Sequence, residues 1–306
     1  MTSSRRLHVV MARAGVGSRR TCEALIASGQ VAVNGETVEE QGMLVNPARD
    51  TITVSGRPLP KPPAVPAVLL YYKPRGVVTT MSDPEGRPSV GDLIARLDRR
   101  LYPVGRLDRD SEGLMILTDH GELARRLGHP SFGVARTYLV TVSGRPTAAT
   151  LRAIASGVRL EDFHTAPTEV VMLQQGADRA RLYLTLTEGR NREIRRLFAH
   201  FGHDVLKLRR TTIGPLEDPT MAPGSYRPLS IAEIRALFSA VDLKPGPLEE
   251  NRASVRPRLI PPGAPVTPIG ARVRPPLTAG VRRHPVVRKP VAFTKPRARS
   301  GAEHDV

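Results

Sequence analysis

The chain has 306 residues, enough for two domains, and 40% of them are hydrophobic, which is enough to form real cores. Its net charge of +17 indicates a polyanionic partner, most commonly a nucleic acid. No apolar run is long enough to span a bilayer, and no signal-peptide core follows the first residues. The single cysteine, Cys22, excludes an internal disulfide and a Cys-rich zinc site. We therefore expect a soluble, cytoplasmic protein that binds a polyanion.

The first 57 residues are predicted to form a small module with two helices and a little sheet. Apolar residues at helical spacing indicate a helix over 5–14, and Ser18 is placed to N-cap a second helix over 19–28. The segment 31–38 alternates around Asn34-Gly35, which is a strong hairpin signal. A module of this size is marginally stable by itself, which favours a binding attachment over an enzyme.

Basic residues gather where the two helices of this module meet. Arg13, Arg19 and Arg20 flank the junction, where they can face a phosphate backbone together, although basic helix faces are often merely solvated. The stretch LHVVMARAGVGSRRTCEALIASGQVAVNGE resembles the S4 RNA-binding domain. The resemblance implies that Arg13, Ser18, Arg19 and Arg20 lie on an RNA-binding surface. It also implies a missing contact at Val9, where a basic residue is expected.

A proline-rich segment over 58–66 is predicted to be a stiff, extended linker. The following region, 67–241, interleaves short strands with single helices, which indicates an α+β domain with a mixed or antiparallel sheet. Its strands are expected over 68–72, 77–80, 101–104, 114–117, 137–142, 170–173, 181–186 and 205–210, and its helices over 90–97, 122–127, 147–156, 191–201 and 231–238. Neither a Rossmann glycine pattern nor a Walker motif is present, so we expect no nucleotide cofactor.

The last segment, 242–306, is predicted to be disordered. Proline recurs through it, large apolar residues are sparse, and 13 Lys and Arg residues stand against 5 acidic ones. The segment could serve as a non-specific RNA arm that contacts phosphates, or it could be a solubilising tail. The sequence leaves both open.

The most informative stretch of the second domain is 105–118, where a charged turn leads into an apolar strand. Gly105 and Gly113 relax the backbone on either side, which would let the loop fold tightly and another molecule approach it closely. Asp108 stands on this loop and could be a nucleophile or a base, although most Asp residues in such loops are turn formers. Asp110 and Glu112 are interpreted as surface charges of the loop.

Two arginine clusters follow, one over 189–196 and one over 207–210. On a helix, Arg192, Arg195 and Arg196 fall on one side, while Ile194 and Leu197 can point inward. By pattern alone these clusters could be solvated surface charge.

Several motifs of this domain resemble, in order, those of the RNA pseudouridine synthases of the RsuA/RluB branch: YYKPRGVVTT, VGRLDRDSEGLMILTDHGELARRLGHP, ARTYLV, EGRNREIRRLF and LKLRRTTIGPL. The DPEGRP segment is most similar to the RluB type, which modifies the large-subunit (23S) ribosomal RNA. Together with the S4-like module, the resemblance covers about residues 5–240.

The resemblance implies a catalytic role for three residues. Asp108 matches the family's nucleophile, which attacks the target uridine at either C1′ of the ribose or C6 of the base. Tyr138 matches a tyrosine that stacks on the flipped uracil and assists removal of the C5 proton. Arg195 matches the arginine that pairs with the catalytic Asp, where it would keep the carboxylate ionised and fix its rotamer. Arg136 stands where relatives usually have lysine, so the charge is retained.

The resemblance also implies the partners of the protein. Its substrate would be ribosomal RNA or an assembling ribosomal subunit, and we expect a monomer that needs no cofactor and no metal. Further RNA contacts are expected at Lys73, Arg106, Arg190, Arg192, Arg209 and Arg210. Two alternatives are a non-catalytic rRNA-binding assembly factor with the same fold and a small-molecule hydrolase with an aspartate nucleophile. The three intact catalytic positions oppose the first alternative, and the basic charge with the S4-like module opposes the second.

Overall fold

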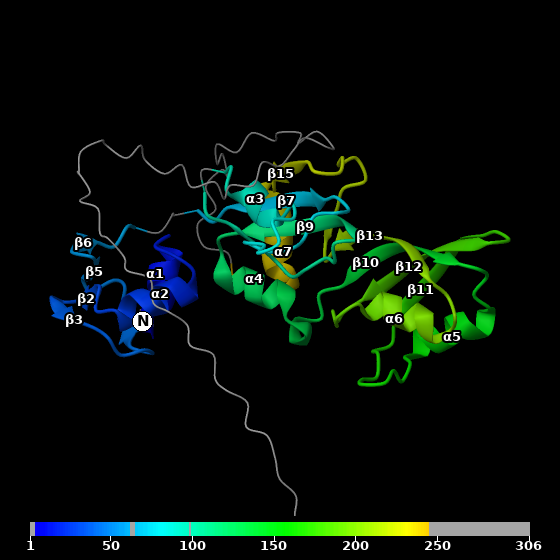
Figure 1. Cartoon of the computed structure of the whole chain (residues 1–306), viewed down its shortest axis with the longest axis horizontal. Helices are drawn as coiled ribbons and strands as arrows, with labels where there is room; N and C mark the ends of the chain where they lie inside the picture. The colour runs from blue at the N-terminus through cyan, green and yellow to red at the C-terminus, as the bar shows by residue number, and fades with distance from the viewer. Residues whose placement is uncertain (1–3, 62–64, 98, 245–306) are drawn as a thin grey trace, which may run out of the picture. The chain divides into compact units, whose positions relative to one another are not determined.

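The computed structural model describes residues 4–61, 65–97 and 99–244 (Figure 1). The tail predicted to be disordered therefore lies almost wholly outside the described residues, as does the middle of the proline-rich linker.

The N-terminal module is built from two helices and six short strands around its own core. Helix α1 (Leu7–Arg13) and helix α2 (Arg19–Ala27) correspond to the two predicted helices. As predicted, Ser18 caps α2, with its Oγ accepting a hydrogen bond of 2.9 Å from the Thr21 backbone N–H. The small sheet has the order β3-β2-β5-β6, and its strands are β2 (Val31–Val33), β3 (Glu36–Thr37), β5 (Ile52–Val54) and β6 (Arg57–Pro58). The predicted hairpin around Asn34-Gly35 is the pair β2–β3.

A separate pair of short strands, β1 (Arg5–Arg6) and β4 (Leu44–Val45), was not predicted. Eight buried residues form the core of the module, among them Leu7, Met11, Cys22 and Ile26. Cys22 is a buried free thiol.

Residues 67–244 form a nine-stranded sheet with helices packed on it. Along the sheet the order is β11-β12-β10-β13-β9-β7-β15, with β14 beside β13 and β8 beside β9. The pairing of β9 with β13 is parallel and all the others are antiparallel, which confirms the predicted α+β class with a mixed, largely antiparallel sheet. The strands are β7 (Val68–Lys73), β8 (Tyr102–Pro103), β9 (Glu112–Thr118), β10 (Arg136–Ser143), β11 (Glu169–Gln175), β12 (Arg179–Leu186), β13 (Val205–Ile213), β14 (Leu216–Glu217) and β15 (Tyr226–Pro228).

Apolar side chains alternate along these strands and create a core on each face of the sheet. Strands β7 and β9 are buried on both faces, because successive side chains enter two different apolar clusters. One cluster lies with α3 (Val90–Ile94), α5 (Ala148–Ser156) and α6 (Glu193–His200), and the other with α4 (Gly121–Gly128) and α7 (Ile231–Ala240). A short 3₁₀ turn, η1 (Pro130–Phe132), follows α4.

Most of the predicted elements of this region are present, but one is wrong. Residues 77–80 form no strand and contribute only an isolated bridge between Val78 and Ser89. The backbone of Val78 and Thr80 instead forms hydrogen bonds with the segment 88–91. The Thr79 hydroxyl bonds both the carbonyl and the N–H of Leu107. Leu107 directly precedes Asp108, so these hydrogen bonds hold the backbone next to that residue.

Candidate active site

The loop that carries Asp108 is held at several points by other parts of the chain. The Thr79 hydroxyl donates to the Leu107 carbonyl at 2.7 Å and accepts from the Leu107 N–H at 3.2 Å. The Gly76 N–H donates to the Arg109 carbonyl at 2.7 Å. The Asp108 side chain itself stays 34% exposed. A fixed backbone beneath an accessible carboxylate is the arrangement that a positioned nucleophile requires.

The two glycines of this loop have different roles. Both adopt positive φ, +70° at Gly105 and +113° at Gly113. A Cβ at Gly105 would meet nothing within 4 Å, whereas a Cβ at Gly113 would lie 2.2 Å from the Arg210 carbonyl oxygen. The expectation that both glycines admit another molecule is therefore wrong for Gly113, since the close neighbour there is strand β13 of the same chain.

Arginines of α6 reach the acidic loop, but not in the predicted pairing. Arg195 Nη2 lies 2.9 Å from Asp110 Oδ2, and the guanidinium also donates to the Val205 carbonyl at 2.9 Å. The arginine that contacts Asp108 is Arg192, with Nη1 3.8 Å from Asp108 Oδ2 and 3.7 Å from Asp110 Oδ1. The predicted direct pair between Arg195 and Asp108 is thus not formed.

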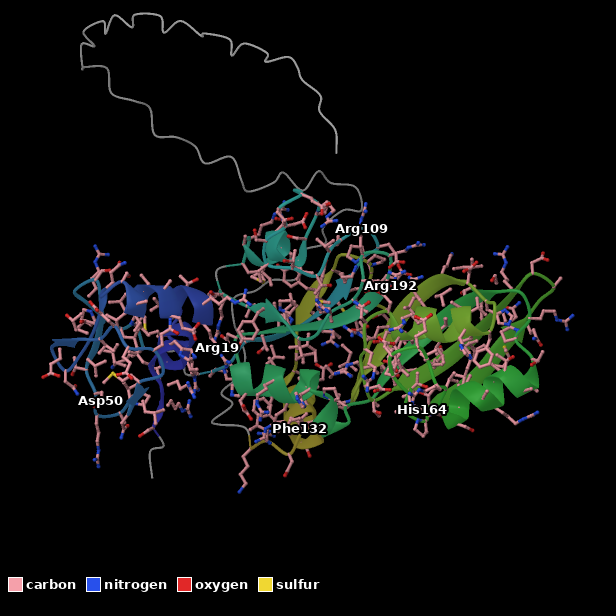
Figure 2. The ribbon with its side chains drawn as sticks, turned by 60° about the horizontal axis from the view of Figure 1, so that its bottom comes forward. Arg19, Asp50, Arg109, Phe132, His164 and Arg192 are labelled. Carbon is pink, nitrogen blue, oxygen red and sulfur yellow. The ribbon has the colours of Figure 1, made fainter. Side chains whose placement is uncertain are left out.

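The start of the helix explains this difference. The sequence predicts a helix from 191, but α6 begins at Glu193, and Arg192 is its N-cap in the left-handed region (φ 49°, ψ 31°). Arg192, labelled in Figure 2, therefore does not share a helix face with Arg195 and Arg196. Arg196 pairs with Asp162 instead.

Asp110 is more than the surface charge that the sequence suggests. Its Oδ1 is buried and makes no hydrogen bond within the described residues, although Arg192 lies near it. Burial lowers the pKa of the Arg195 guanidinium, and the charge of Asp110 opposes that shift. Asp110 therefore anchors the half-buried Arg195 against the loop.

Lys73 completes the group on the inner side. Its side chain is fully buried, and Nζ donates to the carbonyls of Pro74 (2.9 Å) and Val77 (2.7 Å). Burial lowers the pKa of Lys73 to about 8, while the charges of Asp108 and Asp110 oppose that shift. The prediction that Lys73 contacts RNA is therefore wrong, because a cation at the end of β7 has turned inward. We refer to Asp108, Asp110, Lys73, Arg192 and Arg195 as the charge cluster.

Tyr138 lies in the buried apolar core of the nine-stranded sheet. It stands on β10, is 9% exposed, and belongs to the same buried apolar group as Leu107 and Ile194. Leu107 directly precedes Asp108 and Ile194 directly precedes Arg195, so this apolar group contains the chain neighbours of two members of the charge cluster.

The other predicted RNA contacts differ in accessibility. Arg210 is 3% exposed and its Nε donates to the Leu114 carbonyl at 2.7 Å, so the prediction of an RNA contact there is wrong. Arg209 is half-buried over the Tyr72 ring. The remaining ones are exposed: Arg13, Ser18, Arg19, Arg20, Arg106, Arg190 and Arg192.

Sequence reasoning missed a pair of acidic residues, Glu193 at the start of α6 and Glu188 in the segment before it. The Glu193 side chain is 3% exposed, and its Oε2 accepts a hydrogen bond from the Arg190 N–H at 2.9 Å. Burial raises the pKa of Glu193 to about 7, and the nearby carboxyl of Glu188 adds to that shift. An acid directly after a Gly-Arg-Asn-Arg turn, where it can cap the turn's own backbone, is the signal that could have revealed it.

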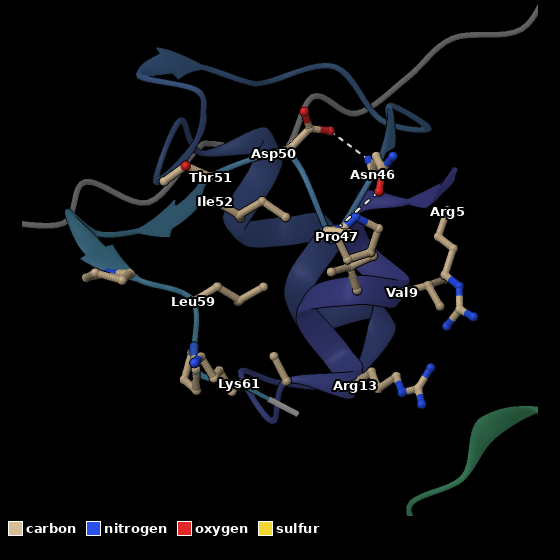
Figure 3. Close-up of a pocket in the computed structure, with 15 residues that line it drawn as sticks. Arg5, Val9, Arg13, Asn46, Pro47, Asp50, Thr51, Ile52, Leu59 and Lys61 are labelled. Atoms are coloured by element: carbon tan, nitrogen blue, oxygen red, sulfur yellow. Dashed lines mark hydrogen bonds between the residues drawn. The ribbon is translucent and has the colours of Figure 1, made fainter. Parts of the chain in front are cut away.

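The N-terminal module has a hollow of its own, with a cavity of about 690 Å³. Figure 3 shows Val9 on its wall with Arg5 and Arg13 at one side and Leu59 at the other. The position where the sequence suggested a missing basic contact is thus an apolar part of this wall.

Among the described residues, no three His, Cys, Asp or Glu side chains are grouped so that they could hold a metal ion. None of the described helices is both long and apolar enough to cross a bilayer.

Comparison with known proteins places both parts of the chain. A family model described as RNA pseudouridylate synthase matches residues 67–200, and one described as S4 domain matches residues 5–52. The chain is 40% identical over 239 residues to the ribosomal large subunit pseudouridine synthase B of Bacillus subtilis, covering 78% of this chain and 97% of the relative. It is 39% identical over 240 residues to an uncharacterized RNA pseudouridine synthase of Aquifex aeolicus, covering 78% and 96%. A solved crystal structure of a pseudouridylate synthase matches with a TM-score of 0.54 and 29% identity, covering 76% of this chain and 99% of that one.

Proposed function

The chain belongs to the RNA pseudouridine synthases, and on that premise we propose that it isomerises a uridine of large-subunit (23S) ribosomal RNA to pseudouridine. The 40% identical relative from Bacillus subtilis, which is named for the large ribosomal subunit, supports this choice of substrate. The net charge of +17 and the S4 domain over 5–52 support an RNA substrate in general.

The accessible Asp108 on a pinned loop is the observation that carries the proposal. In the reaction the C1′–N1 glycosidic bond breaks, a C5–C1′ bond forms, N1 gains a proton and C5 loses one. Asp108 is the group placed to attack the nucleotide, at C1′ or at C6, because its carboxylate is exposed while its backbone is held by Leu107 and Thr79. The isomerisation consumes no second substrate, so the pocket only has to bind and orient one nucleotide.

The charge cluster gives Asp108 its setting. Arg192 approaches Asp108 from the solvent side, and the charge of the buried Lys73 acts on it from within. We assign to Arg192 the role of counter-ion to Asp108, and to Arg195 that of holding Asp110 and the loop.

Tyr138 is proposed to stack on the uracil after the nucleotide leaves the RNA helix. Neither the glycosidic bond nor C6 can be reached inside a stacked helix, so the target must be extruded. Tyr138 belongs to the same buried apolar cluster as Leu107 and Ile194, the residues that precede Asp108 and Arg195. Its hydroxyl is the proposed acceptor of the C5 proton.

For the organisation of the chain, we propose an RNA-binding domain over 1–57, a linker over 58–66, whose first residue in β6 still pairs with Thr53 of β5, and a catalytic domain over 67–241. Arg13, Arg19 and Arg20 are exposed on the first domain, and Arg106 and Arg190 on the second, where they can contact phosphates of the same RNA. We propose that the protein acts as a monomer in the cytoplasm.

The test uses rRNA transcripts labelled with tritium at C5 of uridine. Isomerisation releases that tritium to water, so large-subunit RNA should lose label in the presence of the protein and pseudouridine should map to discrete positions. Release from small-subunit RNA instead would contradict the proposed substrate. RNA binding without any release would leave only the assembly-factor alternative.

A further inference from the structure

Four strands at one end of the large sheet leave one of their faces open. On the other face, the buried residues Val140 and Leu184 pack in one cluster with Ile154 of α5 and Phe198 of α6 (Figure 1). On the open face the alternate residues are accessible, with Val171 45% exposed and Tyr183 36% exposed. We refer to the open side of β11, β12, β10 and β13 as the outer face.

The register places apolar and aromatic side chains in one row across the outer face. Tyr183 on β12 is opposite Val171 on β11 and opposite Leu139 on β10. Leu139 is in turn opposite Arg209 on β13. With strands spaced by about 4.8 Å, this row extends over roughly 14 Å, and Tyr183 is its one aromatic member.

Basic residues form the neighbouring row. Thr141 on β10 is opposite Arg181 on β12 and opposite Lys207 on β13, and both basic side chains are exposed. By alternation the outer face carries four cations and one acid, namely Arg179, Arg181, Lys207, Arg209 and Glu169. The face is therefore cationic as well as apolar.

A pocket of about 390 Å³ lies where the row ends at β13. Tyr72, Tyr183, Thr137, Arg209 and Asp218 are among its lining residues. The Arg209 guanidinium lies 5.6 Å from the centre of the Tyr72 ring, and its buried Nε makes no hydrogen bond within the described residues. Two acids also line this pocket: Asp218 is engaged by Arg227 at 2.8 Å, and Glu217 is exposed.

We propose that the outer face binds a single-stranded stretch of the RNA substrate, outside the catalytic pocket. A base stacks on Tyr183, Arg181 and Lys207 contact the flanking phosphates, and the pocket beside Arg209 takes the next phosphate or sugar. An exposed aromatic side chain among cations on a four-stranded sheet is an established means of binding single-stranded RNA. The inference rests on the proposed function for the identity of the RNA.

Charge repulsion opposes two other candidate partners for the outer face, the C-terminal segment and a second copy of the protein. The C-terminal segment 242–306 carries 13 cationic and 5 acidic residues, so it would be repelled by a face with four cations. A second copy of this face would meet the same repulsion. RNA is attracted by every cation on it.

The experiment measures binding of the full-length protein to a single-stranded oligouridine 12-mer by fluorescence anisotropy over a range of salt concentrations. Tyr183→Ala should weaken binding about fivefold or more, because it removes a stacked base. Tyr183→Phe keeps the ring and should bind like wild type. Arg181→Ala with Lys207→Ala should reduce the slope of log K against log salt by about 1.4, since each phosphate contact on a single strand contributes about 0.7. Arg235→Ala, an exposed cation of α7, is the matched control and should leave the slope unchanged.

Two outcomes would overturn the proposal. The first is oligouridine binding by Tyr183→Ala equal to that of wild type while pseudouridine formation on rRNA proceeds. The second is unchanged binding to naked RNA with lost binding to protein-containing ribosomal particles, which would make the outer face a protein-docking surface. The proposed function fails separately: a wild-type protein that forms no pseudouridine but still depends on Tyr183 for RNA binding would refute the reaction and support the outer face.

Discussion

Substitution of the two glycines in the Asp108 loop separates backbone strain from packing. Gly105 and Gly113 both have positive φ, so alanine at either site adopts a strained left-handed conformation, which costs about 1–2 kcal/mol. At Gly105 nothing lies within 4 Å of the new Cβ, and the cost ends there. At Gly113 the Cβ would lie 2.2 Å from the Arg210 carbonyl oxygen and 2.6 Å from its nitrogen.

The atoms that a Cβ at Gly113 would meet belong to the Arg210 backbone, which cannot rotate away as a side chain could. Moving β13 disturbs the pairs Arg209–Glu112 and Arg210–Gly113, the parallel register that joins the two halves of the sheet. Overpacking of this kind adds about 1–3 kcal/mol, so we expect Gly113→Ala to destabilise by about 2–5 kcal/mol in total. Urea unfolding followed by circular dichroism measures both variants against wild type. Equal midpoints for Gly105→Ala and Gly113→Ala would refute this account of how the loop is held.

The remaining predictions concern the charges around the site. The pKa of Glu193 is raised to about 7, so between pH 4.5 and 7 the folded protein keeps a proton on Glu193 that the unfolded chain has released. The stabilisation that this proton gives the folded state is complete below pH 4.5 and is lost as the pH rises through 7. Glu193→Gln should remove that loss, on the order of 2 kcal/mol, in urea titrations at pH 5 and pH 8; the same pH dependence in both proteins would contradict it. Arg195→Ala should destabilise the fold by about 2–4 kcal/mol, because Asp110 loses its nearer arginine. Replacing the exposed Arg192 by alanine should cost under about 1 kcal/mol and mainly slow the reaction. A larger loss of stability in Arg192→Ala and a larger loss of rate in Arg195→Ala, in urea and kinetic assays, would oppose these roles. Lys73→Met should change the free energy of unfolding by less than about 2 kcal/mol, because the gain from removing a buried cation with a pKa of about 8 offsets the loss of hydrogen bonds to two carbonyls. The same substitution should lower kcat at least about tenfold. An unchanged kcat would show that the charge of Lys73 does not matter to the reaction.

The regular elements could be predicted from local patterns, because their formation depends on residues that are close together in the sequence. Helical spacing with the Ser18 cap, the Asn34-Gly35 turn and the alternation along β10 all depend on near neighbours in the chain. Residues 77–80 were predicted wrongly because their β propensity says nothing about the loop around Leu107, which takes the hydrogen bonds of Thr79. Long-range partners decide such segments.

The site could be predicted by residue but not by pairing. Motif resemblance selected Asp108, Tyr138 and Arg195; the Asp108 carboxylate is 34% exposed, Tyr138 is buried in the apolar core, and their catalytic roles stay predictions. The ion pairs depend on where α6 begins, and a left-handed Arg192 is not visible in the sequence. Burial of Lys73 was equally hidden, because a lysine at a strand end is usually solvated.

The most direct test of the central claim is pseudouridine formation on large-subunit rRNA by Asp108→Asn. The substitution keeps the size of the side chain and removes the nucleophilic carboxylate, so we expect no tritium release and no mapped pseudouridine while RNA affinity stays close to that of wild type. Asp110→Asn is the matched control on the same loop and should retain measurable activity. Product formed by Asp108→Asn at the wild-type rate would contradict the assignment of Asp108 as the nucleophile.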